Sequence, residues 1–257
     1  MDLAALPKAG DLARQHAALG SHAPRWRPGL GGAGAVHSEV FASGREASGA
    51  AVALALALDG MRASELDRQE ERAVLWVQDE AAIRLTGRPY RAGLSEPLRR
   101  RLIHVAAHKA ADALFALEEG VRCRDLACVI GEIAGNSREL DFTASRRLSL
   151  TAERHGVPLF LVRLDAKADL SSARMRWRVS AAPSPPPLWN TAAPGAPAWH
   201  AELFRARNHA PGEWILCDDP RNGWGSLVAE KPSADPATPP DHGNLAGAAG
   251  GGPLAAF

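Results

Sequence analysis

Runs of apolar residues recur along the middle of the chain and alternate with segments in which apolar residues return every three or four positions. Continuous apolar runs are typical of strands buried on both faces, and the wider spacing is typical of amphipathic helices. The predicted strands lie at 40–41, 74–80, 102–105, 127–133 and 157–164. The predicted helices lie at 50–58, 108–121 and 143–155, the last with Thr143 as N-cap. Residues 83–96 predict irregular structure, because Gly and Pro interrupt them.

Two later segments have a different pattern. In 173–181 and 198–218, polar and apolar residues alternate with a period of two. This alternation predicts strands with one solvated face, which usually pair in the antiparallel sense. Strands alternating with helices, followed by these two segments, predict an α/β sandwich with a mostly parallel sheet and antiparallel strands at its C-terminal edge.

Composition divides the chain into three parts. Residues 1–36 predict a short N-terminal helix and a linker rich in Gly and Pro, and residues 37–219 predict the core domain. Residues 220–257 are rich in Pro, Gly and Ala and poor in large apolar side chains, which predicts a disordered tail.

The charges nearly balance, with a formal net charge of +1 and 46% apolar residues. A chain without a basic excess has no long-range attraction to nucleic acid or to anionic membranes, so we expect contact with DNA to be weak or indirect. The three cysteines form no CxxC pair, and no apolar run reaches the about 18 residues of a membrane span. Since no signal peptide is recognised either, the sequence predicts a cytoplasmic protein with no membrane contact.

A glycine-containing stretch follows the first predicted strand and precedes the first helix. Gly44 and Gly49 keep the G-x-x-x-x-G spacing of a phosphate-binding loop, with Ser48 directly before the second glycine. Such a loop continues with Lys, which contacts the outer phosphates, and with Ser or Thr, which binds Mg²⁺. Ala50 and Ala51 occupy these positions here. The sequence therefore predicts a degenerate nucleotide-binding loop without catalytic residues or a cofactor, and an ordinary strand-to-helix connection is the alternative.

Acidic and histidine side chains give weak indications of a catalytic or metal site. Asp79 and Glu80 end a predicted strand, and we interpret them as solvated acids in preference to catalytic carboxylates. His104 and His108 are four residues apart, but His104 belongs to a predicted strand, so the two do not share a helix face. We predict no metal site.

The most prominent basic pattern lies in the first of the two alternating segments. Arg174, Arg176 and Arg178 alternate with apolar residues, so we expect them on one exposed strand face. Together with Arg205 and Arg207 they are the preferred candidate for a partner or nucleic-acid surface, and protection of an edge strand against aggregation is the alternative. Two further groups of arginines are interpreted as hydrated surface: Arg99–Arg101, and Arg146 with Arg147 and Arg154.

An ordered set of stretches between His37 and Cys217 carries a resemblance to a known family. The stretches are HSEVFA, VLWVQ, AADALFALEEGVR, LACVIGEIAG, DFTASRRLSLTAERHGVP, ARMRWRV and ELFRARNHAPGEWIL. In this order they resemble a RecA-type recombinase core, and within that superfamily they resemble the ImuA group. ImuA proteins are RecA-like accessory proteins of bacterial damage-induced mutagenesis.

The resemblance implies a RecA-like three-layer fold and a role in SOS-induced translesion DNA synthesis. It implies that the protein binds an ImuB-type inactive homologue of Y-family polymerases and is not itself a polymerase. An error-prone C-family DNA polymerase and RecA are further partners that the resemblance suggests.

The resemblance also assigns roles to individual positions. It places Glu80 where RecA-type ATPases have the glutamate that activates water, and it places Glu132 one position after the expected magnesium-ordering acid. The loops with which RecA grips single-stranded DNA correspond to 135–142 and 164–172, and both are short here. Since the second also carries two aspartates, filament-type DNA binding is not expected.

Three other functions remain open from the sequence. The first is a weak or atypical ATPase that uses backbone amides and Glu80. The second is a RecA-like inhibitor of cell division. The third is a recombination mediator that binds single-stranded DNA through Arg176 and Arg178.

Overall fold

The computed structural model describes residues 37–63, 71–186, 190, 193, 195–207, 210–218 and 227–230. The predicted N-terminal helix and linker lie outside these residues, as does the predicted tail from residue 231 onward.

The described residues form one nine-stranded sheet in the order β3-β2-β4-β5-β1-β6-β7-β8-β9. All neighbours from β3 to β6 are parallel, and the strands from β6 to β9 pair in the antiparallel sense. The strands are β1 (His37–Ala42), β2 (Ala73–Asp79), β3 (Leu102–Ala107), β4 (Leu126–Ala134), β5 (Leu159–Leu164), β6 (Met175–Ala182), β7 (Ala198–Ala206), β8 (Gly212–Asp218) and β9 (Leu227–Glu230).

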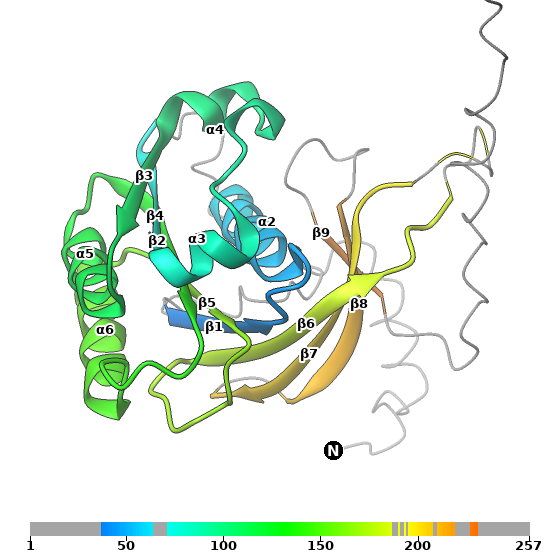
Figure 1. Ribbon diagram of the computed structural model, residues 1–257. Coiled ribbons are helices and arrows are strands. Elements are labelled where there is room, and N and C mark those ends of the chain that lie inside the picture. The colour runs from blue at the N-terminus through cyan, green and yellow to red at the C-terminus, as the bar shows by residue number, and fades with distance from the viewer. Residues whose placement is uncertain are drawn as a thin grey trace, which may run out of the picture.

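Helices cover both faces of the sheet (Figure 1). One face carries α2 (Ser48–Ala63), α3 (Glu80–Thr86) and α4 (Glu96–Arg101), and the other carries α5 (Ala110–Arg122) and α6 (Phe142–His155). A short 3-10 helix, η3 (Arg91–Gly93), lies between α3 and α4. The predicted RecA-like three-layer α/β fold, with antiparallel strands at its C-terminal edge, is confirmed.

Each face has its own apolar core. Val52 and Leu56 of α2 pack in one cluster with Trp76 of β2 and Trp177 of β6. Leu203, Leu216 and Leu227 of the antiparallel strands belong to the same cluster. The helix α2 is apolar around most of its surface because it packs against both the parallel strands and the antiparallel extension. On the other face, α5 and α6 form the second cluster with residues of β2, β4 and β5.

Three local predictions are wrong. Residues 83–96 are only partly irregular, because α3 begins at Glu80 with the Asp79 side chain accepting from the Ala82 N–H, and α4 begins at Glu96. The N-cap of α6 is Asp141, whose carboxylate accepts from the Ala144 N–H, and not Thr143. The strand β9 lies inside the region predicted to be a disordered tail, so the sheet continues to Glu230.

No helix in the described part of the chain has the length and apolar character needed to cross a membrane.

Candidate functional site

The connection between β1 and α2 is the five-residue loop 43–47, here called the β1–α2 loop. The strand β1 lies inside the sheet between β5 and β6, both of which run parallel to it. The loop therefore leaves the carboxyl end of a central parallel strand, which is where ligand sites form in open α/β sheets.

The two glycines of the loop region are required by close packing. A Cβ atom on Gly49 would lie 2.7 Å from Val162 Cγ1 and 2.8 Å from Ala42 Cβ. A Cβ atom on Gly44 would lie 2.6 Å from an Asp165 carboxylate oxygen and 2.9 Å from Leu85 Cδ1. The G-x-x-x-x-G spacing thus lets the start of α2 approach β5 and lets the loop approach Asp165.

The Asp165 carboxylate lies beside the backbone of the β1–α2 loop and accepts a hydrogen bond from it. The Gly44 N–H donates to Asp165 Oδ1 at 3.0 Å, and the Asp165 N–H donates back to the Ala42 carbonyl at 3.0 Å. Asp165 holds this position in a left-handed backbone conformation, with φ at 49°. A side-chain carboxylate of the chain itself therefore accepts a loop N–H of the kind that a phosphate-binding loop offers to a phosphate oxygen.

The positions after Gly49 supply no charge and no hydroxyl group. Ala50 packs against the apolar core, and the Ala51 N–H makes a helical bond of 3.0 Å to the Ala47 carbonyl. Ser48, the first residue of α2, is 3% exposed. The helix therefore begins as a phosphate-binding helix would, without the lysine and the metal-binding hydroxyl that the chemistry needs.

A cleft of about 370 Å³ opens beside the β1–α2 loop, between it and strands β6 and β7. Three carboxylates line it, from Glu46, Asp165 and Glu202, together with Arg178 and His200. Arg178 forms an ion pair with Glu202, and Glu46 accepts from the Ala181 N–H at 3.0 Å. Because acids outnumber cations on its wall and Arg178 is already paired, the cleft disfavours a polyphosphate.

The two acids after β2 have different environments. Asp79 is 4% exposed, and the solvated position interpreted from the sequence is wrong for it, since its carboxylate caps α3. Burial raises the pKa of Asp79 above its ordinary value, and the bond from the Ala82 N–H opposes that rise. Glu80 is in solvent, where it pairs with Arg84 at 3.0 Å and lies 4.0 Å from His108.

Neither acid stands next to the loop. The strand β2 is separated from β1 by β4 and β5, which places its end three strand spacings, about 14 Å, from the end of β1. Glu80 could reach a nucleotide only if the nucleotide extended across the ends of these strands.

Glu132 of β4 is a buried structural acid. It is 1% exposed, and Oε1 accepts from Trp76 Nε1 at 2.6 Å and from Gln78 Nε2 at 3.0 Å. Thr86 donates to the other carboxylate oxygen at 3.2 Å. Burial raises the pKa of Glu132, while these hydrogen bonds lower it. Its carboxylate oxygens are therefore committed to neighbouring side chains of β2 and α3.

The expected exposed arginine stripe is wrong at its centre. Arg176 is 3% exposed and forms a 2.7 Å ion pair with Glu39, which is 1% exposed. Arg174 precedes β6 and pairs with Glu153 of α6, and the exposed Arg178 pairs with Glu202. Each of the three arginines predicted for a binding surface thus has a carboxylate of this chain as its partner.

Aromatic rings complete the surroundings of Arg176. Its guanidinium carbon lies 5.1 Å from the ring centre of Phe41 and 5.3 Å from that of Phe204. Arg205 and Arg207, which were predicted to extend the stripe, are exposed on and just after β7.

The two loops that correspond in position to the DNA-gripping loops of RecA, at 135–142 and 164–172, are hydrogen-bonded to the rest of the fold. In the second, Ser171 donates to Glu39 Oε1 at 2.7 Å and also contacts Ser145 Oγ at 2.8 Å. The Lys167 N–H donates to Asn136 Oδ1 at 2.9 Å, which joins the two loops to each other. Their polar groups therefore serve contacts within the protein.

The two histidines considered for a metal have separate partners. His104 Nε2 lies 2.9 Å from Gln78 Oε1, and His108 is exposed near Glu80. Among the residues that the structure describes, no group of three or more His, Cys, Asp or Glu side chains is placed to hold a metal ion.

Sequence reasoning missed the groups that change the site most. In the sequence, Asp165 is only a negative charge in a loop, and no local pattern distinguishes Glu39 or Glu46. Gly44 and Asp165 are 121 residues apart, and Glu39 and Arg176 are 137 apart. Only the strand order, which brings β5 and β6 to either side of β1, would have revealed these contacts.

Comparisons with known proteins give one relationship. No protein-family model matches the chain. Two curated relatives named Protein ImuA, from two strains of Caulobacter vibrioides, are each 36% identical to it over 154 residues. The match covers 56% of this chain, and the chain spans about 59% of the length of these relatives.

Proposed function

We propose that this chain is a member of the ImuA family, because it is 36% identical over 154 residues to two proteins of that name, and that it is a non-catalytic scaffold of mutagenic translesion synthesis. In this role it binds an ImuB-type inactive homologue of Y-family polymerases. An error-prone C-family polymerase and RecA are further partners in the proposal, which places the protein in the cytoplasm as part of the SOS response.

The contact between Asp165 and the Gly44 amide is the main support for the proposal that the protein is non-catalytic. A triphosphate at the β1–α2 loop would need the N–H that donates to Asp165 and would place its own negative charge beside that carboxylate. It would meet neither a lysine nor a metal-binding hydroxyl, because Ala50 and Ala51 follow Gly49. The loop therefore lacks the groups that attract a triphosphate and has beside it a carboxylate that repels one.

The paired arginines support a protein partner over a nucleic acid. Binding to single-stranded DNA requires a groove of available cations together with exposed aromatic faces. Arg174, Arg176 and Arg178 already have carboxylate partners, and Arg176 also lies against two phenylalanines. A recombination mediator that uses these arginines is therefore the less favoured function.

Two measurements on the purified full chain test the proposal. Titration with ATP and Mg²⁺ by calorimetry should give no binding heat, and a mixture with the ImuB-type protein should elute as one complex from a sizing column. Micromolar ATP affinity together with turnover that disappears in Glu80→Gln would instead establish an ATPase. Failure of the two proteins to associate would remove the scaffold role.

A pair of variants tests whether the Asp165 carboxylate keeps ATP from binding to the β1–α2 loop. Asp165→Ala combined with Ala50→Lys removes the carboxylate and supplies the missing cation, so this variant should bind ATP with a measurable heat and at least tenfold more tightly than its matched control. Asp169→Ala combined with Ala50→Lys is the matched control, because Asp169 lies in the same loop without contacting Gly44. Equal ATP affinity of the two variants would show that Asp165 does not block the loop.

A further inference from the structure

The outer surface of the α5–α6 layer carries large apolar side chains in solvent. Phe115 of α5 is 68% exposed and Leu150 of α6 is 53% exposed. Both belong to helices whose opposite sides already fill the second core, so neither is needed for packing there. Apolar side chains gathered on one outer face, with charged neighbours, are a feature of protein interaction sites.

Arginines surround the exposed leucine. Arg146 and Arg154 lie four residues before and after Leu150, and Arg147 lies three residues before it, so all three are its neighbours on the helix surface. The only acid of α6, Glu153, pairs with Arg174 and not with any of them. In the part of the chain that the structure describes, Arg146 and Arg154 have no ion-pair partner.

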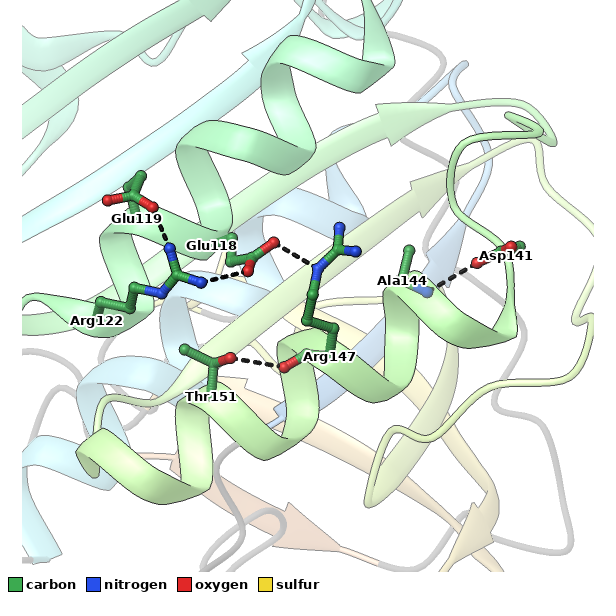
Figure 2. Close-up of polar contacts among 7 residues, drawn as sticks. All are labelled: Glu118, Glu119, Arg122, Asp141, Ala144, Arg147 and Thr151. Atoms are coloured by element: carbon green, nitrogen blue, oxygen red, sulfur yellow. Dashed lines mark hydrogen bonds and ion pairs between the residues drawn. The ribbon is translucent and has the colours of Figure 1, made fainter.

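A shared carboxylate fixes the two helices against each other (Figure 2). Glu118 of α5 pairs with Arg122 of its own helix and with Arg147 of α6, at 2.6 Å in both cases. Only 12% of the Glu118 side chain is exposed, so the bridge is largely shielded from solvent. The helices α5 and α6 therefore present one continuous surface to a partner.

The spacing of the apolar residues suits a helical partner. Phe115 lies one turn before Glu118, and Leu150 lies about one turn after Arg147, the residue that Glu118 contacts. Since both helices run antiparallel to the same parallel strands, Phe115 and Leu150 are offset by roughly 9 Å along the helix axes. On a partner helix that lies between α5 and α6 and parallel to them, two apolar residues about two turns apart have nearly this axial offset.

We propose that Phe115, Arg146, Arg147, Leu150 and Arg154, here called the α5–α6 patch, dock an acidic amphipathic helix of a partner protein. Phe115 and Leu150 receive the apolar residues of that helix, and Arg146 and Arg154 pair with its carboxylates. The occupant is acidic where it lies over α6, because every exposed charge of α6 is an arginine. Over α5 it offers an apolar side chain to Phe115 and no carboxylate, because the exposed neighbours of Phe115 on that helix, Asp112 and Glu119, are acids. It is a protein segment in preference to DNA because its contacts include an exposed phenylalanine and leucine in addition to cations.

The test needs no knowledge of the natural partner, so its outcome is separate from that of the proposed scaffold role. Displayed random peptides of about four helical turns are selected on the immobilised full chain. The enriched peptides should carry two apolar residues about two turns apart, with Asp or Glu beside the one that contacts Leu150. Their affinity should fall at least tenfold for Leu150→Ser and for Arg146→Glu combined with Arg154→Glu, and it should weaken with added salt.

Matched variants elsewhere separate this effect from general loss of apolar or basic surface. Leu170→Ser removes an apolar side chain that is 76% exposed outside the patch, and Arg100→Glu reverses an exposed charge on α4. Both should bind the peptides within twofold of the unmodified chain, and the melting temperature of every variant is measured to verify that it folds.

Several results would overturn the proposal. These are no enrichment, enrichment of peptides without acidic residues, or acidic peptides that bind the patch variants and the control variants equally well. Binding of an oligo-thymidine strand that is lost in the Arg146 and Arg154 variant, with no peptide binding, would assign the surface to nucleic acid instead.

Discussion

Glu39 and Arg176 form a buried ion pair between neighbouring strands, with the carboxylate oxygen 2.7 Å from the guanidinium Nε. Glu39 lies on β1 and Arg176 on β6, directly opposite each other in the parallel register. The pair thus joins the strand that leads into the β1–α2 loop to the first strand of the antiparallel extension.

Removing the carboxylate of this pair should destabilise the fold strongly. Glu39→Gln leaves Arg176 as a buried charge without its partner, and we expect a loss of about 3–5 kcal/mol in the free energy of unfolding. Urea denaturation measures it. Glu202→Gln is the control, because it breaks the more exposed pair with Arg178 and should cost less than about 1 kcal/mol. Equal effects of the two substitutions would contradict the buried character of the Glu39 pair.

Gly49→Ala should be destabilising although alanine is the better helix former. The new Cβ would lie within 2.8 Å of both Val162 Cγ1 and Ala42 Cβ, so α2 must move away from the sheet. Overpacking of this kind costs about 1–3 kcal/mol, more than the roughly 1 kcal/mol gained from helix propensity. Thermal unfolding measures the change. Arg45→Ala, on the exposed loop, should stay within about 0.5 kcal/mol, and a Gly49→Ala protein as stable as the unmodified one would show that α2 is free to shift.

His37 should make the protein less stable in acid. Burial lowers the pKa of His37 from 6.5 to about 4, so between these values the unfolded chain binds a proton that the folded chain does not. The contribution is complete above pH 6.5 and is lost as the pH falls towards 4, by on the order of 3 kcal/mol.

Urea denaturation at a series of pH values measures this loss. In His37→Gln the part of the decline due to His37 should disappear between pH 6.5 and 4, whereas His108→Gln, which alters an exposed histidine, should keep it. An unchanged pH dependence in His37→Gln would show that His37 is not the group responsible.

Glu132 should make the folded protein less stable as the pH rises, which is opposite to the effect of His37. Burial raises its pKa, so the folded chain holds this proton to a higher pH than the unfolded chain does, and stability falls as the pH rises from the ordinary pKa to the raised one. Glu132→Gln has no proton to lose, and its amide can still accept from Trp76 and Gln78.

The variant should therefore become more stable relative to the unmodified protein as the pH rises from about 4 towards 7. Parallel urea titrations of the two proteins give this difference, with Glu119→Gln as an exposed control. If the difference does not change with pH, Glu132 does not titrate in this range.

The order of strands and helices could be predicted because each element has its own local pattern of apolar residues. The apolar runs at 74–80, 127–133 and 157–164 each correspond to a strand, and the three-to-four spacing at 108–121 corresponds to α5. The short helix α3 was missed because Gly87 and Pro89 dominate its surroundings, although Asp79 directly before it was a usable capping signal. The strand β9 has four residues and depends on its pairing with β8, which no local pattern contains.

The sequence predicts that the candidate site lacks the lysine and the hydroxyl group of a phosphate-binding loop. It does not predict that the Asp165 carboxylate contacts that loop. Ala50 and Ala51 can be read directly from the sequence. The contact between Asp165 and Gly44 depends on β5 lying beside β1. The period-two pattern around Arg176 shows which residues share a face of the strand, but it does not show which face the rest of the protein covers. An arginine in this pattern predicts exposure, whereas its ion pair with Glu39 makes the burial of Arg176 tolerable.

The contact from Asp165 to the Gly44 amide also bears on the order of events during biosynthesis. The loop emerges from the ribosome long before its partner, since 121 residues separate the two. A nascent chain that ends before β5 would hold the loop without that carboxylate, so the loop acquires its mature shape only once most of the sheet has been translated.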